Sequence, residues 1–215
     1  VTNTLPYELI RDQCDIIIEG STGGLNDLTA AERSVSLQTD IEMASLNPGS
    51  INYDGGVYVN APKDVQYWAS EIKRCGIKPD VAIFDVAMVD TTVDLVAQGL
   101  IDPPVLFGLI LGQKGALPAE ARHLVHLVET LPQGSVWAAA GHGGSDLKVA
   151  MLSMAMAGHV RAGFEDNAYY APGQRAESNA QLVSRLVRLA EELGRPVATP
   201  TEARKMLGLE HDHQS

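Results

Sequence analysis

Short apolar runs alternate with longer segments of helical periodicity along almost the whole chain, and this alternation constrains the fold more than any other feature. The apolar runs lie at 15–19, 42–46, 80–86, 105–111, 136–140 and 159–162, and the helical patterns at 29–37, 64–75, 90–99, 118–131, 146–157, 179–193 and 201–207. Runs that recur in this way predict parallel strands joined by crossover helices that cover the sheet from outside. After the second run, residues 51–59 alternate with tyrosines and predict a short hairpin.

Polar and glycine-rich residues follow several of the predicted strands, at Ser21, Asn47, Gly141 and Glu165. An eight-stranded barrel builds its site from the loops after many strands, whereas a dinucleotide-binding fold concentrates glycines in one GxGxxG loop, which this chain lacks. We therefore expect an α/β fold of the TIM (β/α)8 barrel type, with residues 1–215 as a single domain. Since only six strand–helix units are visible, we expect two further units of about 30 residues each before Val1.

The composition disfavours several kinds of partner. The chain has 27 acidic and 16 basic residues and a net charge of −11, which disfavours binding to nucleic acid and to anionic membranes. No apolar run approaches the roughly 18 residues of a membrane-spanning helix. The two cysteines, Cys14 and Cys75, have no CxxC spacing and indicate reduced thiols in a cytoplasmic protein.

The densest group of chemically active side chains follows the last predicted strand. Arg161, Glu165, Asp166 and Asn167 lie within seven residues there, where a barrel commonly places a phosphate or metal site. As a functional site, this segment would use Glu165 as a metal ligand, Asp166 as a base and Arg161 as an anchor for a carboxylate. As structure alone, it would be a solvated loop with an internal arginine–carboxylate pair.

Two glycine-rich turns offer backbone N–H groups to an anion. The first combines the hydroxyls of Ser21 and Thr22 with the bare backbone of Gly23 and Gly24, which suits an anionic oxygen. The second, at 141–145, precedes a predicted helix and would either hold a phosphate at the helix N-terminus or be a tight turn capped by Ser145 or Asp146.

These segments together resemble the β-keto acid cleavage enzymes. Residues 158–167 (GHVRAGFEDN) are similar to a signature of that family, and the segments 21–24 (STGG), 43–52 (MASLNPGSIN) and 78–85 resemble further signatures in the same order. The similarity covers essentially the whole chain. It implies a zinc-dependent barrel enzyme that converts a β-keto acid and an acyl-CoA, usually acetyl-CoA, into acetoacetate and a new CoA thioester. It also implies a homo-oligomer, often a tetramer.

The resemblance implies roles for individual residues. Glu165 would be the zinc ligand, and Asp166 would be the base, working with Arg161. The substrate would be bound by Ser21, Thr22, Gly23, Gly24, Ser45 and Asn47, and CoA would contact Gly141, Gly143 and Gly144.

The chain departs from the family pattern in three places. The paired zinc histidines of the family have no counterpart here, so we expect them upstream of Val1. Ala82 stands where many relatives carry a glutamate, and Gly144 stands near a position that is often basic. Three functions therefore stay open: the zinc-dependent CoA enzyme, a metal-dependent barrel aldolase or lyase that does not need CoA, and a non-catalytic remnant or split subunit.

Overall fold

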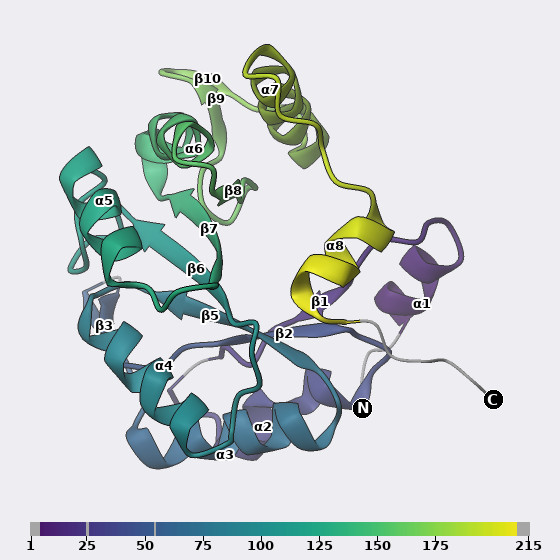
Figure 1. The fold of residues 1–215 in the computed structure, drawn as a ribbon, viewed down its shortest axis with the longest axis vertical. Coiled ribbons are helices and arrows are strands. Elements are labelled where there is room, and N and C mark those ends of the chain that lie inside the picture. Colours follow the sequence, from purple (N-terminus) through teal and green to yellow (C-terminus); the bar gives the residue numbers. More distant parts are fainter. Residues whose placement is uncertain (1–4, 25, 54, 210–215) are drawn as a thin grey trace.

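The sheet is parallel and curls into part of a barrel in the computed structural model, which describes residues 5–24, 26–53 and 55–209. Its strands follow the order β1-β2-β5-β6-β7-β8. They comprise β1 (Glu19–Gly20), β2 (Met43–Leu46), β5 (Lys78–Ile83), β6 (Leu106–Leu111), β7 (Val136–Gly141) and β8 (His159–Val160). Figure 1 shows the helices that follow β1, β2, β5 and β6 on the outer side of the curled sheet. This partial TIM barrel confirms the predicted fold class.

Most of the helices lie between successive strands of the sheet and cover its outer face. The helices are α1 (Leu5–Arg11), α2 (Ala30–Arg33), α3 (Pro62–Arg74), α4 (Ala87–Ala97), α5 (Ala121–Thr130), α6 (Asp146–Ala155), α7 (Asn179–Glu192) and α8 (Pro200–Leu207), with 3₁₀ turns at Val35–Gln38 and Gly143–Ser145. Among the described residues, no helix is long and apolar enough to cross a membrane.

The alternation of side chains along each strand separates the core from the barrel interior. On β5, Val81 and Ile83 are fully buried in the apolar core, together with Trp68 of α3 and Phe107 of β6. Successive side chains of a strand point to opposite faces, so Ala82 on the same strand points the other way and lines the interior cavity. The outer face of the sheet therefore stabilises the fold, and the inner face is free to carry chemistry.

Two hairpins flank the sheet. The hairpin predicted at 51–59 is confirmed, with β3 (Ile51–Tyr53) antiparallel to β4 (Gly56–Tyr58). A second hairpin, β9 (Tyr169–Ala171) with β10 (Gln174–Arg175), was not predicted, and neither was α1. The Pro172-Gly173 pair between β9 and β10 is a turn signal that could have revealed the second hairpin.

The starts of two helices show how capping sets their boundaries. The helical pattern at 64–75 corresponds to α3, which begins two residues earlier, at Pro62, with Ala61 as its cap. Proline suits the first helical position because its φ is already helical and no N–H is needed there. For α8, Thr199 is the cap, and it forms a capping box with Glu202.

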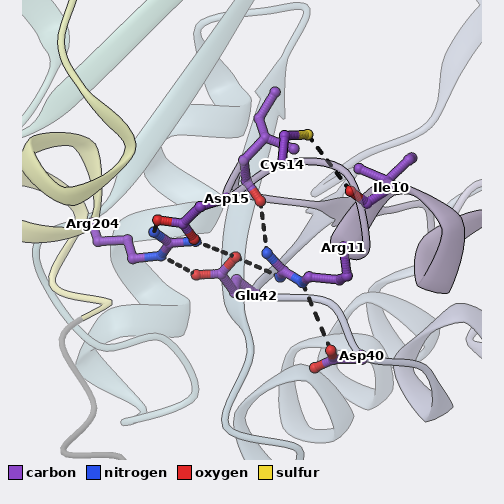
Figure 2. A network of polar contacts seen from close by, with 8 residues as sticks. Ile10, Arg11, Cys14, Asp15, Asp40, Glu42 and Arg204 are labelled. Atoms are coloured by element: carbon purple, nitrogen blue, oxygen red, sulfur yellow. Dashed lines mark hydrogen bonds and ion pairs between the residues drawn. The ribbon is translucent and has the colours of Figure 1, made fainter.

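A polar network attaches α8 to the segments that precede β1 and β2 (Figure 2). Arg204 donates to both oxygens of Glu42 (2.5 and 3.2 Å) and lies 2.8 Å from Asp15. Arg11 of α1 donates to the same Glu42 carboxylate at 2.6 Å. Burial alone would raise the pKa of Glu42, but the hydrogen bonds from Arg204 and Arg11 outweigh it and lower the pKa. The C-terminal helix is thus held beside the N-terminal part of the chain by one shared carboxylate.

Candidate active site

The carboxyl ends of the strands open into a cavity of about 650 Å³. The hairpin of β3 and β4 forms another part of its wall. Of the predicted site residues, the cavity is lined by Ser21, Gly23, Gly24, Ser45, Asn47, Arg161, Glu165 and Asp166. Its volume lies within the range of small-molecule sites, about 300–1,000 Å³. The structure therefore brings residues from both ends of the chain to one place, because parallel strands end at the same edge of the sheet.

Arg161 binds two carboxylates at the edge of this cavity. Its Nε and Nη2 donate to the two oxygens of Asp166 at 3.0 and 3.1 Å, and Nη2 also donates to Glu165 at 2.8 Å. The Asp166 side chain is only 3% exposed, whereas that of Glu165 is 82% exposed. Burial alone would lower the pKa of Arg161, but Asp166 and Glu165 outweigh it and raise the pKa. The guanidinium therefore stays charged and fixes the orientation of Asp166.

Backbone hydrogen bonds hold the loop that carries these carboxylates. The N–H groups of Asp166 and Asn167 both donate to the carbonyl of Gly163. The side chain of Asn179, the first residue of α7, accepts from the Phe164 N–H at 2.8 Å. His142 approaches from the end of β7, with Nε2 3.8 Å from an oxygen of Asp166. Asp166 is thus positioned by its own loop, by Arg161 and by the start of α7.

The Ser21–Gly24 turn presents some of its groups to the cavity and turns others away. Ser21 Oγ accepts from the Gly23 N–H at 2.9 Å and lies 3.4 Å from Ser45 Oγ. Thr22 is fully buried and does not line the cavity, because its hydroxyl donates to the Ser45 carbonyl at 2.6 Å. Thr22 therefore joins the turn to β2, and the structure does not bring its side chain to the substrate space.

Of the turn at 141–145, His142 lines the cavity, but the three glycines that were predicted to contact CoA do not. Gly141, Gly143 and Gly144 are not among the lining residues. Gly143 has a positive φ of 60°, and its N–H donates to the Asp166 carbonyl at 2.8 Å, so this N–H is already engaged. Ser145 Oγ donates to the His142 carbonyl, and α6 begins at Asp146. The turn supports the loop of Asp166, and a contact with CoA here stays a prediction.

Two carboxylates of the barrel interior were missed in the sequence. Glu19 lines the cavity, and Asp80 lies on β5 with its Oδ1 buried and without a hydrogen-bond partner among the described residues. Burial raises the pKa of Asp80; burial together with the charge of Asp80 raises the pKa of Glu19. Glu19 is exposed to the open cavity, so solvent screens its charge in part. Both residues stand in runs that were interpreted only as strands, although the period of two could have assigned them to the inner face.

The described residues do not assemble a metal site by themselves. Over residues 5–24, 26–53 and 55–209, no group of three or more His, Cys, Asp or Glu side chains is placed to hold a metal ion. Glu165 lines the cavity, but its carboxylate forms an ion pair with Arg161. The assignment of Glu165 as a zinc ligand therefore stays a prediction.

Comparison with known proteins places these features in a family. The family described as beta-keto acid cleavage enzyme matches residues 6–209. The 3-keto-5-aminohexanoate cleavage enzyme of Fusobacterium nucleatum is 42% identical over 204 residues, which are 94% of this chain and 74% of the relative. The 3-oxoadipate:acetyl-CoA acetyltransferase of Cupriavidus necator is 39% identical over 197 residues, 90% of this chain and 69% of the relative.

A solved structure supports the same architecture. The apo structure of ObcA superposes with a TM-score of 0.76 at 21% identity, over 93% of this chain and 52% of that chain. At this identity the likeness shows the fold alone. The chain described here spans about half the length of that solved protein.

Proposed function

Since the chain belongs to the β-keto acid cleavage enzyme family, we propose that it converts a β-keto acid and acetyl-CoA into acetoacetate and an acyl-CoA. The observation that carries the proposal is the Asp166 carboxylate, which Arg161 fixes at the wall of the cavity. The name of the Cupriavidus necator relative supports acetyl-CoA as the co-substrate.

Asp166 is the group suited to start the reaction as a base. Each of its oxygens accepts one hydrogen bond from Arg161, which leaves a further lone pair on each oxygen for a proton. The proton to be removed lies on C2 of the β-keto acid, between the ketone and the carboxylate. A base that is already oriented needs no rearrangement before it accepts that proton.

The bond changes that follow are balanced between the two substrates. The C2 carbanion bonds to the acetyl carbon of acetyl-CoA, and the CoA thiolate leaves. The thiolate then adds to the original ketone carbon, and the bond between that carbon and C2 breaks. This releases the new acyl-CoA and the carbanion of acetoacetate, which takes back the proton from Asp166.

The other lining residues bind and orient in this proposal. Ser21, Gly23 and Gly24 hold the substrate carboxylate, and Ser45 and Asn47 contact the rest of the β-keto acid. When bound, zinc would polarise the ketone oxygen as a Lewis acid. Of the residues of this chain, the family resemblance assigns only Glu165 to such a site. A homo-oligomeric assembly and a cytoplasmic location stay predictions.

An assay with and without acetyl-CoA tests the proposal. The full-length protein is incubated with a panel of β-keto acids, and acetoacetate and acyl-CoA are measured by mass spectrometry. We expect both products only when acetyl-CoA is present. Consumption of a β-keto acid without acetyl-CoA would indicate an aldolase or lyase instead, and no turnover of any member of the panel would contradict the proposal.

A further inference from the structure

A buried arginine without a carboxylate partner lies directly behind the cavity wall. Arg33 of α2 is 5% exposed, and its guanidinium stacks on the ring of Trp68 at 4.0 Å. Its donors reach the carbonyls of Thr22 (3.1 Å) and Val59 (3.0 Å), the hydroxyl of Tyr58 (2.6 Å) and the side-chain oxygen of Asn60 (2.6 Å). All four acceptors are neutral. Among the described residues Arg33 forms no ion pair, and Asp64 acts on it only through longer-range attraction.

The charge of Arg33 lies against the turn that was expected to hold the substrate. A Cβ placed on Gly24 would come within 2.8 Å of Arg33 Cγ, so the turn passes directly over this side chain. The Thr22 carbonyl of the same turn accepts from Arg33 Nε. An uncompensated charge in a poorly solvated position acts more strongly on its surroundings than one in water. Arg33 therefore contributes a positive potential to the Ser21–Gly24 side of the cavity.

An anionic substrate needs that potential, because the cavity itself is acidic. Glu165 and Asp166 both line it, and Arg161 is the one lysine or arginine among the described residues of its wall. Arg161 already binds Glu165 and Asp166. The net charge of Glu165, Asp166 and Arg161 is negative, so this side of the wall repels the substrate carboxylate, whereas Arg33 attracts it to the Ser21–Gly24 side.

Tyr58 connects the guanidinium of Arg33 to the cavity. It lines the cavity from the end of β4, and its Oη lies 3.3 Å from where a Cβ on Gly23 would be. Its Oη accepts from Arg33, while its own proton has no acceptor among the described residues. A hydroxyl that accepts from a guanidinium is a stronger donor, since hydrogen bonds in a chain polarise one another.

We propose that the Tyr58 hydroxyl donates to the substrate carboxylate beside the Ser21–Gly24 turn. Arg33 is the positioning residue that holds both Tyr58 and the turn. This rests on the proposed function for the identity of the substrate as a β-keto acid. It assigns a binding role to two residues that no sequence motif marked.

The variant Tyr58→Phe tests the proposal without disturbing the packing. The ring over Arg33 stays, and Arg33 Nη2 keeps Asn60 as an acceptor. We expect the Kd of acetoacetate, measured by titration calorimetry, and the KM of the β-keto acid both to rise about tenfold, the size of one hydrogen bond to a charged group. The value of kcat should stay near that of the wild type, because such a contact stabilises the bound substrate and the transition state by the same free energy. Tyr67→Phe, which removes a hydroxyl from α3 away from the cavity, is the matched control.

Two variants of Arg33 separate its charge from its packing. Arg33→Lys keeps the charge, and Arg33→Met keeps most of the volume without it. We expect acetoacetate affinity per folded molecule to fall in the order wild type, Arg33→Lys, Arg33→Met. A purely structural role would lower the unfolding midpoint of both variants and leave their affinities equal, which would overturn the role of Arg33.

The outcomes distinguish this inference from the proposed function. A wild-type Kd and KM in Tyr58→Phe would overturn the inference, even if the wild-type enzyme forms acetoacetate as proposed. A tenfold weaker acetoacetate complex in an enzyme that turns over no β-keto acid would overturn the proposed function and support the inference.

Discussion

Replacing Asp166 by asparagine separates the chemical role of this side chain from its structural one. The substitution keeps the size of the side chain and removes its charge and one acceptor oxygen. One of the two Arg161 donors, now at 3.0 and 3.1 Å from Asp166, would face an amide N–H and lose its acceptor. An acceptor lost at such a buried position costs about 1–3 kcal/mol of stability.

The effect on catalysis is expected to be larger and different in kind. If Asp166 is the base, its loss should lower turnover by about 10²-fold or more, the usual scale of general acid–base catalysis. The assay measures acetyl-CoA-dependent acetoacetate formation at saturating substrate, and circular dichroism corrects the rate for the folded fraction. Urea unfolding gives the loss of stability independently.

A second aspartate provides the control for this variant. Asp102 pairs with Lys73 at 2.7 Å on the exposed surface and lies away from the cavity. Asp102→Asn should cost at most about 1 kcal/mol and leave turnover unchanged. If folded Asp166→Asn keeps turnover within about threefold of the wild type, Asp166 is not the base and the reasoning fails.

Two other carboxylates give predictions about metal content and pH. Glu165→Gln should lower the zinc content of the purified full-length protein. The free energy of unfolding should change by less than about 1 kcal/mol, because the ion pair of Glu165 with Arg161 is exposed. An unchanged zinc content by elemental analysis would contradict the ligand assignment. The folded state lowers the pKa of Glu42 below its usual value of 4.5, so the unfolded state binds more protons at acidic pH. The stability from this group is therefore complete above that value and is lost as the pH falls through the folded pKa. Glu42→Gln should flatten this acid loss in urea unfolding measured at several pH values, and an unchanged profile would show that the network does not act in this way.

The positions of the strand-end residues could be predicted because they follow from local patterns and one topological rule. Apolar runs marked the strands, and all strands of a parallel sheet end at the same edge. That rule alone brings Ser45 and Arg161 to the same cavity. The pairing of Arg161 with Asp166 could also be predicted, since the two residues are close in sequence.

Other parts of the site depend on contacts that no local pattern encodes. Thr22 and Ser21 are adjacent and chemically alike, but the fold turns the Thr22 hydroxyl to the Ser45 carbonyl. Arg33 and Tyr58 are 25 positions apart and meet only because α2 packs under the hairpin. Whether a polar side chain contacts a substrate or supports its neighbours is decided by such long-range packing.

The attachment of α8 also affects the order in which the protein can be completed during synthesis. The Arg204 contacts to Glu42 and Asp15 span 162 and 189 residues, so they form only after the chain through α8 has left the ribosome. Until then, Arg11 is the one cationic partner of Glu42 among the described residues. A nascent chain that stalls before α8 therefore carries the Glu42 and Asp15 carboxylates without the arginine that joins them, so the segments before β1 and β2 are fixed in place only once α8 has been made.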